Sequence, residues 1–417
     1  MVRLLTSAML IAMAGIAANA ADIAPGHSAS IGMDVGYVNV SAYPSWTDGS
    51  VGKLRYGDDG LGINRAFLDY RGRWTDTLSA HLVLEGYDDD IGSAIDFTQA
   101  YLEWRPVPKS ANRYRVKLGA FYPPISLENV DAAWSSPYTA SFSAINTWIA
   151  EEIRTLGAEL SISRRLASLS GLHTLSLDIA AFQGNDPAGS LLAWKGWSVH
   201  DRQTRFGDQL PLPPLPQIQP GMLFAAQDPY VDPFREVDGR FGYYANGQWR
   251  YTQTLLLRAG RYDNRADPTA IEDGQYAWYT EFTHLGLQMS LPGDAGLIAQ
   301  WMRGSTVMGP VAFANGVHAV DTEFDSYFAL LSKPYGRHRL SIRYDNFELT
   351  QNDQAPLDDN RENGHALTLS YQRGLSDSLG LVAEAISIKT HRNSWRYFGF
   401  APSKTETQFQ LSLRLRL

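Results

Sequence analysis

A strict alternation of apolar and polar residues constrains this chain more than any other feature. It is clearest in the last nine residues, FQLSLRLRL (409–417), where one face of an extended strand carries Phe409, Leu411, Leu413, Leu415 and Leu417. The other face carries Gln410, Ser412, Arg414 and Arg416, because side chains alternate sides along a strand. A soluble sandwich could bury such leucines, and a membrane barrel could turn them toward lipid. The last strand alone leaves both folds open.

The connections between the alternating segments favour the barrel. Sixteen candidate strands lie near 28–40, 63–74, 77–87, 94–105, 113–121, 154–164, 172–184, 236–245, 248–262, 275–291, 294–305, 323–333, 336–348, 363–374, 377–389 and 405–417. Connections after the even-numbered strands are short, such as Thr75-Asp76 and Asn246-Gly247, whereas most of the others are long. Tight periplasmic turns and long external loops are typical of outer-membrane barrels. The pattern therefore predicts an all-β fold, a sixteen-stranded antiparallel transmembrane β-barrel.

The N-terminus predicts export from the cytoplasm. Residues 1–20 carry Arg3, an apolar stretch and the small-residue site Ala18-Asn19-Ala20, which together are typical of a secretory signal peptide. The barrel would then comprise residues 21–417 and lie in the bacterial outer membrane, in contact with lipid and lipopolysaccharide. The chain has no cysteine, which excludes thiolate metal sites and cysteine nucleophiles, and its net charge of −8 argues against a nucleic-acid partner.

Cations fall on one face of several strands. With the apolar face turned outward, the inward basic residues are Arg71, Arg73, Arg113, Arg115, Lys117, Arg258, Arg337, Arg339, Arg343, Arg414 and Arg416. The opposite parity would place arginines in lipid, at a cost of about 2–4 kcal/mol each near the midplane. We therefore expect these residues to line the lumen, together with acids on the same faces such as Asp69 and Glu159.

Two long connections could occupy or cover the lumen. Residues 122–153 contain Glu128, Asp131, Glu151 and Glu152 and no lysine, arginine or histidine. Folded inward as a constriction loop, they would set an acidic side against the basic wall and so filter small polar solutes; an outward loop with solvated acids is the alternative. Residues 185–235 contain eight of the 21 prolines and are predicted to form a long external loop, because proline removes a ladder donor.

Three segments carry a resemblance to a known family. DFTQAYLEW (96–104), VKLGAFYPPISLEN (116–129) and RTLGAELS (154–161) resemble the phosphate-selective porin O/P family, with the best match over roughly 60–185. The resemblance implies a sixteen-stranded, usually trimeric channel for small anions, whose loop at 122–153 lies inside the pore. The loop here lacks the basic residues on which that family's phosphate selectivity rests, and the chain ends in Leu417 where such barrels commonly end in phenylalanine.

The resulting hypothesis is a porin for passive diffusion of small polar or charged solutes, and the resemblance further implies a preference for phosphate-like anions. It implies no cofactor, no metal and no catalytic residue. A barrel enzyme of the phospholipase or protease type and an adhesin remain as alternatives. The sequence offers them little support, since it contains neither a G-x-S-x-G elbow nor an H-E-x-x-H pair.

Overall fold

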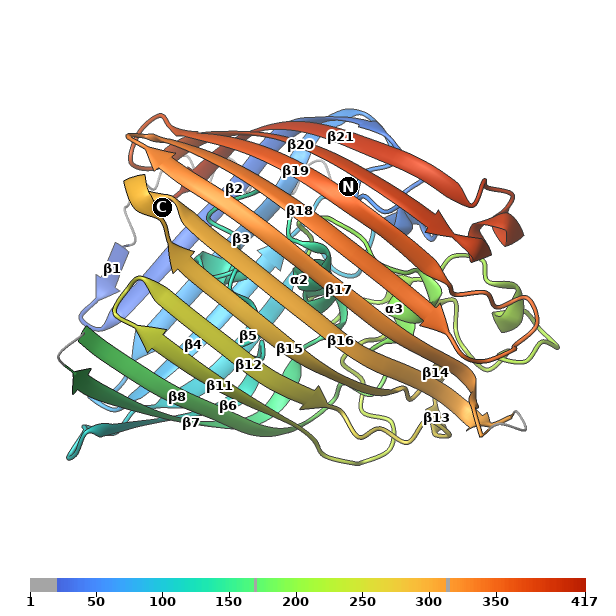
Figure 1. Cartoon of the computed structure of the whole chain (residues 1–417), viewed down its shortest axis with the longest axis horizontal. Helices are drawn as coiled ribbons and strands as arrows, with labels where there is room; N and C mark the ends of the chain where they lie inside the picture. The colour runs from blue at the N-terminus through green and yellow to red at the C-terminus, as the bar shows by residue number, and fades with distance from the viewer. Residues whose placement is uncertain (1–20, 169–170, 313–315) are drawn as a thin grey trace.

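The computed structural model describes residues 21–168, 171–312 and 316–417, so the predicted signal peptide lies outside the described residues. Seventeen strands form one antiparallel sheet, and β1 (Ala21–Ala24) pairs only with the start of its neighbour, which leaves sixteen in the described barrel wall. The first and last of these, β2 and β21, pair along Gly32↔Arg416 to Ser41↔Thr407 and close the sheet. The predicted sixteen-stranded antiparallel barrel is confirmed (Figure 1).

The wall strands span most of the chain. They are β2 (His27–Ser41), β3 (Gly60–Arg73), β4 (Leu78–Gly86), β5 (Ile95–Trp104), β6 (Asn112–Phe121), β7 (Thr155–Ser168), β8 (Gly171–Gln183), β11 (Gly242–Tyr251), β12 (Leu255–Asp263), β15 (Tyr279–Ser290), β16 (Gly296–Val311), β17 (His318–Tyr335), β18 (His338–Gln351), β19 (Glu362–Gly374), β20 (Leu379–Arg392) and β21 (Ser403–Arg416).

Short elements lie in the connections between the wall strands. They are the helices α2 (Ala144–Glu152) and α3 (Ser190–Trp194), the 3-10 turns η1 (Trp46–Asp48), η2 (Ala132–Trp134), η3 (Pro216–Ile218), η4 (Pro292–Asp294) and η5 (Asn393–Phe398), and the strand pairs β9 (Leu210–Pro211) with β10 (Tyr230–Val231) and β13 (Ile271–Glu272) with β14 (Gln275–Tyr276). Among the described residues, the helices are too short or too polar to cross a membrane.

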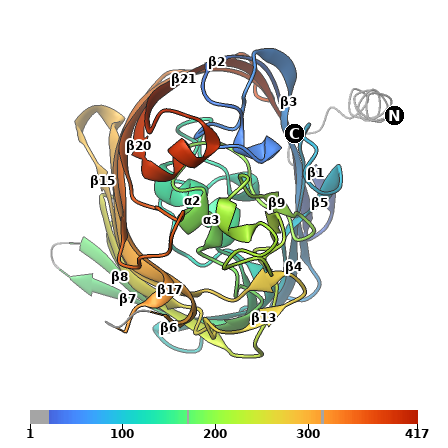
Figure 2. The same ribbon diagram turned by 90° about the vertical axis from the view of Figure 1, so that its right-hand side faces the viewer.

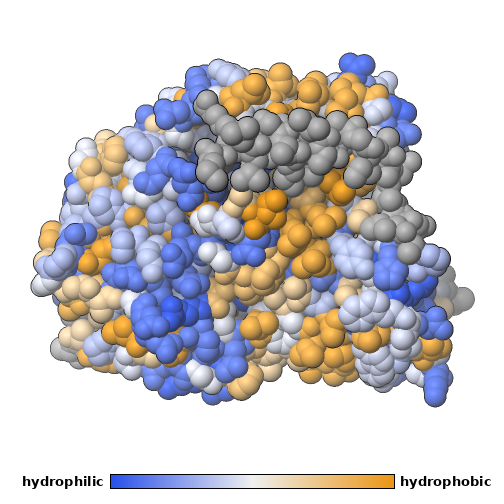
Figure 3. Space-filling model, turned by 180° about the vertical axis from the view of Figure 1, so that it is seen from behind, coloured by the Kyte–Doolittle hydropathy of each residue, from blue (hydrophilic) through white to orange (hydrophobic). Residues whose placement is uncertain are grey.

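The outer face of the wall is apolar over the half that carries the short turns. In β21 the side chains of Phe409, Leu411 and Leu413 are exposed, whereas Gln410 and Ser412 are buried inside. The same parity exposes leucines of β8, β12, β17 and β19, and apolar side chains gather on the outer surface in Figure 3. The alternation of the last strand thus has a simple cause, because its leucines face lipid and its polar residues face the lumen.

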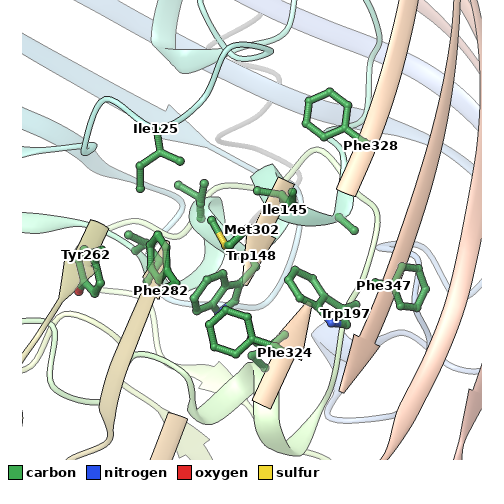
Figure 4. Packing of buried hydrophobic residues seen from close by; sticks show 14 of the residues in the cluster. Ile125, Ile145, Trp148, Trp197, Tyr262, Phe282, Met302, Phe324, Phe328 and Phe347 are labelled. Atoms are coloured by element: carbon green, nitrogen blue, oxygen red, sulfur yellow. The ribbon is translucent and has the colours of Figure 1, made fainter. Parts of the chain in front are cut away.

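The lumen is filled over the half that carries the long connections. Inward aromatic residues of the wall, including Tyr262, Phe282 and Phe324, join Trp148 of α2 and Trp197 in one buried cluster (Figure 4). Figure 2, which looks into this end, shows α2 and α3 inside the ring of strands. The hydrophobic core of this protein therefore sits inside its barrel.

Two sequence predictions need correction. The Asn-Gly pair at 246–247 does not form a hairpin turn: both residues lie within β11, where Asn246 pairs with Asp178 and Gly260, and the chain turns instead after Tyr251. Asn-Gly favours a tight turn locally, but here the amide oxygen of Asn246 lies 2.7 Å from Nε2 of the inward His284, which ties it to the ladder. The external-loop prediction also fails for the first part of 185–235, since residues 185–200 and 202–205 are buried.

Candidate functional site

The first inward segment is the connection between β6 and β7, residues 122–153. It is tied to the wall by Arg343 of β18, whose side chain is fully buried and forms ion pairs with Glu128 at 2.7 Å and Asp345 at 2.9 Å. The same guanidinium donates to the carbonyl oxygens of Ser141 and Phe142, both at 2.8 Å. One wall arginine thus holds the segment by a charged and a backbone contact at once.

Carboxylates of the wall also hold this segment through its backbone. Glu384 of β20 accepts hydrogen bonds from the N–H groups of Ala140 and Ser141 at 2.6 and 2.9 Å. Asp345 accepts one from Ala144 at the start of α2, at 3.0 Å. Irregular backbone inside a barrel needs such partners, because its polar groups would otherwise be buried without hydrogen bonds.

The second inward segment, residues 185–205, packs against the first. Glu151 of α2 forms an ion pair with Lys195, and its carboxylate lies at hydrogen-bond distance, 2.7 Å, from Nε2 of His200. Burial opposes ionisation of Glu151, but the attraction of Lys195 and the hydrogen bond from His200 outweigh it and lower its pKa to about 2. Burial in turn lowers the pKa of His200, against the pull of Glu151.

Glu152 joins the two segments at the start of α3. Its carboxylate accepts hydrogen bonds from the N–H groups of Leu191 and Leu192 at 2.9 and 3.1 Å and from the indole N–H of Trp148 at 2.7 Å. Burial nevertheless raises the pKa of Glu152 to about 7, with the three donors acting in the opposite direction. This acid therefore titrates near neutral pH at the junction of the two segments.

The two segments close the lumen at the level where they meet. Every residue of 141–155 is buried, as are the inward residues Phe282, Phe324, Phe347 and Ile386 of the surrounding wall. Further pairs seal the region, among them the fully buried Lys53–Glu362 at 2.9 Å and Arg392–Glu362 at 2.6 Å. At this level the described structure is a packed protein interior rather than an open channel.

We call the two inward segments together the plug. On the side of the plug that faces the short turns lies the rest of the lumen, which we call the basic vestibule. Its walls carry the inward cations Arg71, Arg73, Arg113, Arg115, Lys117, Arg258, Arg339, Arg414 and Arg416, against the acids Asp34, Asp69, Glu103, Glu159 and Asp178. Arg71 remains 64% exposed despite its contact with Asp69 at 3.3 Å. Within the described wall, cations outnumber carboxylates on this surface.

The predicted basic residues thus separate into three groups. Arg343 faces inward but is covered by the first inward segment, and Arg337 lies at the β17–β18 turn, 63% exposed beside Asp377. The other nine share the basic vestibule. Some of them are paired there: Arg115 and Lys117 both contact Glu159, at 3.0 and 3.1 Å, and Arg416 contacts Asp34 at 2.7 Å.

The four predicted acids do not form one charged side of an aqueous path. Glu128, Glu151 and Glu152 are buried and serve as anchors, while Asp131 is exposed and accepts from the N–H of Ala132. Only Glu128 is ion-paired with the predicted basic wall. The reason is that the second inward segment, assigned by sequence to the outside, supplies partners for the other two.

Sequence reasoning missed the second inward segment and its charged residues, such as Lys195, Arg202 and Arg205. A signal for it exists in β17, where Phe324, Phe328 and Leu330 are apolar on the inward face while Tyr327 and Leu331 are apolar on the outward face. A strand that is apolar on both faces is buried on both. Applied to a barrel, this predicts that something apolar fills the lumen.

Comparison with known proteins supports the fold and leaves the family open. No protein-family model matches the chain, and no curated protein matches it in sequence. Among solved structures, the outer-membrane channel DcaP of Acinetobacter baumannii aligns over 94% of this chain and 98% of its own, with a TM-score of 0.55 and 10% identity. OmpF of Salmonella typhi, in a complex with daunomycin, gives 0.51 at 9% identity over 94% and 98% of the two chains.

A third structure, outer-membrane OmpT of Vibrio cholerae, gives a TM-score of 0.50 at 10% identity, again over 94% of this chain and 98% of the other. At such identities the likeness is one of fold. Together with the closed wall and its apolar outer face, it defines the class: this is a sixteen-stranded β-barrel of the bacterial outer membrane, with the fold that porins and related channels share.

Proposed function

We propose that the protein is an outer-membrane porin, a passive diffusion channel for small polar or charged solutes with a preference for anions. The observation that carries the proposal is the basic vestibule, a section of the lumen lined by more cations than carboxylates beneath an inward-folded loop. A wall of one predominant sign raises the local concentration of oppositely charged solutes. No chemical step, cofactor or metal is part of this function.

The plug implies that passage is gated. Glu128, Glu151 and Glu152 hold the two inward segments through hydrogen bonds and ion pairs, so a solute passes only when these segments move relative to the wall. We therefore infer that the channel conducts in brief openings or with a small conductance. The acids of the first inward segment act mainly as anchors in this proposal, and the cations of the vestibule supply the selectivity.

Phosphate is one candidate solute, in line with the resemblance to the phosphate-selective porin O/P family. The absence of basic residues in 122–153 argues for a broader range of small anions. We further propose that the barrel is a homotrimer that contacts lipid and lipopolysaccharide, as the same resemblance implies.

The test is the zero-current potential of the purified barrel in a planar bilayer under a salt gradient. We expect an anion preference, and we expect Arg113→Gln, Arg115→Gln and Lys117→Gln together to shift it toward cations. Low salt is needed, because the screening length is only about 10 Å at 0.1 M. A triple variant of the outward, exposed Arg261, Arg303 and Lys333 to glutamine is the control, since it removes the same formal charge from the opposite face.

An unchanged potential in the vestibule variant would remove these residues from the conduction path. Complete absence of conductance, in the wild type and in variants that loosen the plug, would refute the channel itself.

A further inference from the structure

A second group of polar residues lies on the outer face of the barrel, at the end that carries the long connections. Ser403 of β21 and His391 of β20 are register partners, and both are exposed. The hydroxyl of Ser403 lies 2.7 Å from Nδ1 of His391, and Nε2 of the same ring lies 3.1 Å from the side-chain oxygen of Asn393. None of these three residues belongs to the plug or to the basic vestibule.

The surroundings decide which ring nitrogen of His391 carries the proton. The Asn393 side-chain N–H₂ donates to a carboxylate oxygen of Asp359 at 3.2 Å. A carboxylate accepts hydrogen bonds when ionised, so the amide oxygen of Asn393 is the atom that faces His391. Nε2–H then donates to that oxygen, which leaves the lone pair on Nδ1 to accept the hydroxyl proton of Ser403.

Asp359 is itself held in the ionised form. Burial opposes this, but the hydrogen bonds from Arg361 and Asn393 lower the pKa of Asp359 below its usual value. Arg361 donates to both carboxylate oxygens, at 2.8 and 2.7 Å. Arg396 adds a second cation 3.5 Å from Asp359, and its Nε donates to the Asn393 carbonyl at 2.9 Å. The orientation of Asn393 is therefore fixed from two sides.

A comparison within the chain shows that this arrangement is not a general property of serine–histidine neighbours. Ser168 lies 3.2 Å from Nε2 of His173, but Nδ1 of that ring accepts the indole N–H of Trp249 at 3.2 Å. In neutral His173 the proton is thus on Nε2, and this nitrogen donates to Ser168 and cannot take its proton. The hydrogen bond between serine and histidine therefore runs in opposite directions at the two ends of the barrel.

We propose that Ser403, His391 and Asn393 form a serine esterase site on the outer rim, a second activity beyond the proposed channel. A serine, a base that accepts its proton and a third group that orients the base are the parts of the hydrolytic triad, which is recognised by these roles rather than by sequence order. Ser403 and His391 are the catalytic residues, and Asn393 and Asp359 are positioning residues.

The reaction balances with water as the only co-substrate. Ser403 Oγ attacks the acyl carbon of a carboxylic ester, its proton passes to Nδ1 of His391, and the alcohol leaves with that proton. Water then attacks the acyl-serine ester, gives a proton to Nδ1 and releases the carboxylic acid as the proton returns to Oγ. No oxidant, reductant or metal takes part.

The position of the site indicates the class of ester. Thr407, four residues from Ser403 on β21, shares the outward face, and the exposed Phe409 follows it. At about 3.3 Å per residue, Ser403 lies about 13 Å from Thr407 along the strand, on the side away from Phe409. The site therefore lies in the headgroup layer or just above it, where it meets water-accessible esters of amphiphiles or soluble esters.

The test uses the whole folded barrel in detergent micelles and a fluorophosphonate probe, with hydrolysis of p-nitrophenyl butyrate as the rate assay. We expect covalent labelling of the wild type, loss of labelling in Ser403→Ala, and a fall in the hydrolysis rate by at least about 100-fold in His391→Ala. Ser168→Ala is the matched control and should keep both, because its histidine cannot act as the base.

The positioning role has its own readout. Asn393→Ala should lower kcat with little change in KM, and Asn393→Asp combined with Asp359→Asn should restore much of the rate, since the new carboxylate accepts a hydrogen bond from Nε2–H without facing a second carboxylate. Release of fatty acid from phosphatidylglycerol vesicles would identify a lipid as the ester source, and turnover of the soluble ester alone would identify a soluble one.

Labelling that persists in Ser403→Ala, or a wild type that is neither labelled nor active, would overturn the proposal. Conductance measured on the same preparations keeps the two functions apart, because Ser403 lies outside the lumen and its replacement should leave the channel unchanged.

Discussion

Arg343 should be the residue on which the plug depends most, and Arg343→Met tests this. Methionine keeps an unbranched apolar chain but leaves Glu128 buried without its cation, and it removes donors to Ser141 and Phe142. Breaking a buried ion pair by removing one partner costs about 3–5 kcal/mol, because it leaves an uncompensated charge in the interior. We therefore expect the free energy of unfolding to fall by about 3–5 kcal/mol.

The assay has two parts, because loss of stability and release of the plug are separate claims. Denaturant unfolding in micelles, followed by tryptophan fluorescence, gives the first, and conductance in a planar bilayer gives the second. Arg339→Met is the matched control: Arg339 lies on the same face of β18, hydrogen-bonds to Ser332 at 2.9 Å and lies 5.5 Å from the ring centre of Tyr138, and among the described residues it forms no ion pair with a carboxylate. It should lose about 1 kcal/mol or less.

A further variant isolates the buried charge. Arg343→Met combined with Glu128→Gln and Asp345→Asn removes all three charges, and buried ionic groups replaced together are often tolerated. This triple variant should recover most of the stability lost in the single one. If Arg343→Met resembles Arg339→Met in both stability and conductance, the anchoring role of Arg343 is wrong.

Two other predictions concern the same plug. Because the pKa of Glu152 is raised to about 7 in the folded protein, the folded state binds more protons than the unfolded state between about pH 4.5 and 7. The free energy of unfolding should therefore fall as pH rises through that range, and Glu152→Gln should reduce the difference in this free energy between pH 5 and pH 8. An unchanged difference would exclude Glu152 as its source. Trp148→Ala should cost about 3–5 kcal/mol and raise conductance, since Trp148 packs edge to face on Phe282 and Phe324 at 5.4 and 5.0 Å. The outward Trp104→Ala, 46% exposed, is its control, and equal losses in the two variants would contradict the packing argument.

Much of the wall could be predicted from sequence, because the alternation of apolar and polar residues along a barrel strand shows which side chains face outward. A side chain that faces lipid must be apolar and one that faces water or polar protein need not be, so the phase of Leu411 and Arg414 is readable from β21 alone. Short turns such as 75–76 and 375–376 are readable for the same reason, since they are local. The Asn-Gly pair in β11 shows the limit, because its place in the ladder depends on strands distant in the sequence.

The sequence by itself determined the closed wall and its parity, because lipid, strand geometry and short turns act on neighbouring residues, whereas it left the course of residues 122–153 open between an inward and an outward loop. Only the tertiary structure decided what fills the lumen. Glu151 contacts Lys195, and Glu152 contacts the start of α3. These residues lie about 40 positions apart, so the periodicity of the sequence does not predict their contacts. The pairing of Ser403 with His391 and the amide orientation of Asn393 are likewise fixed by groups that the chain brings together only when the barrel has formed.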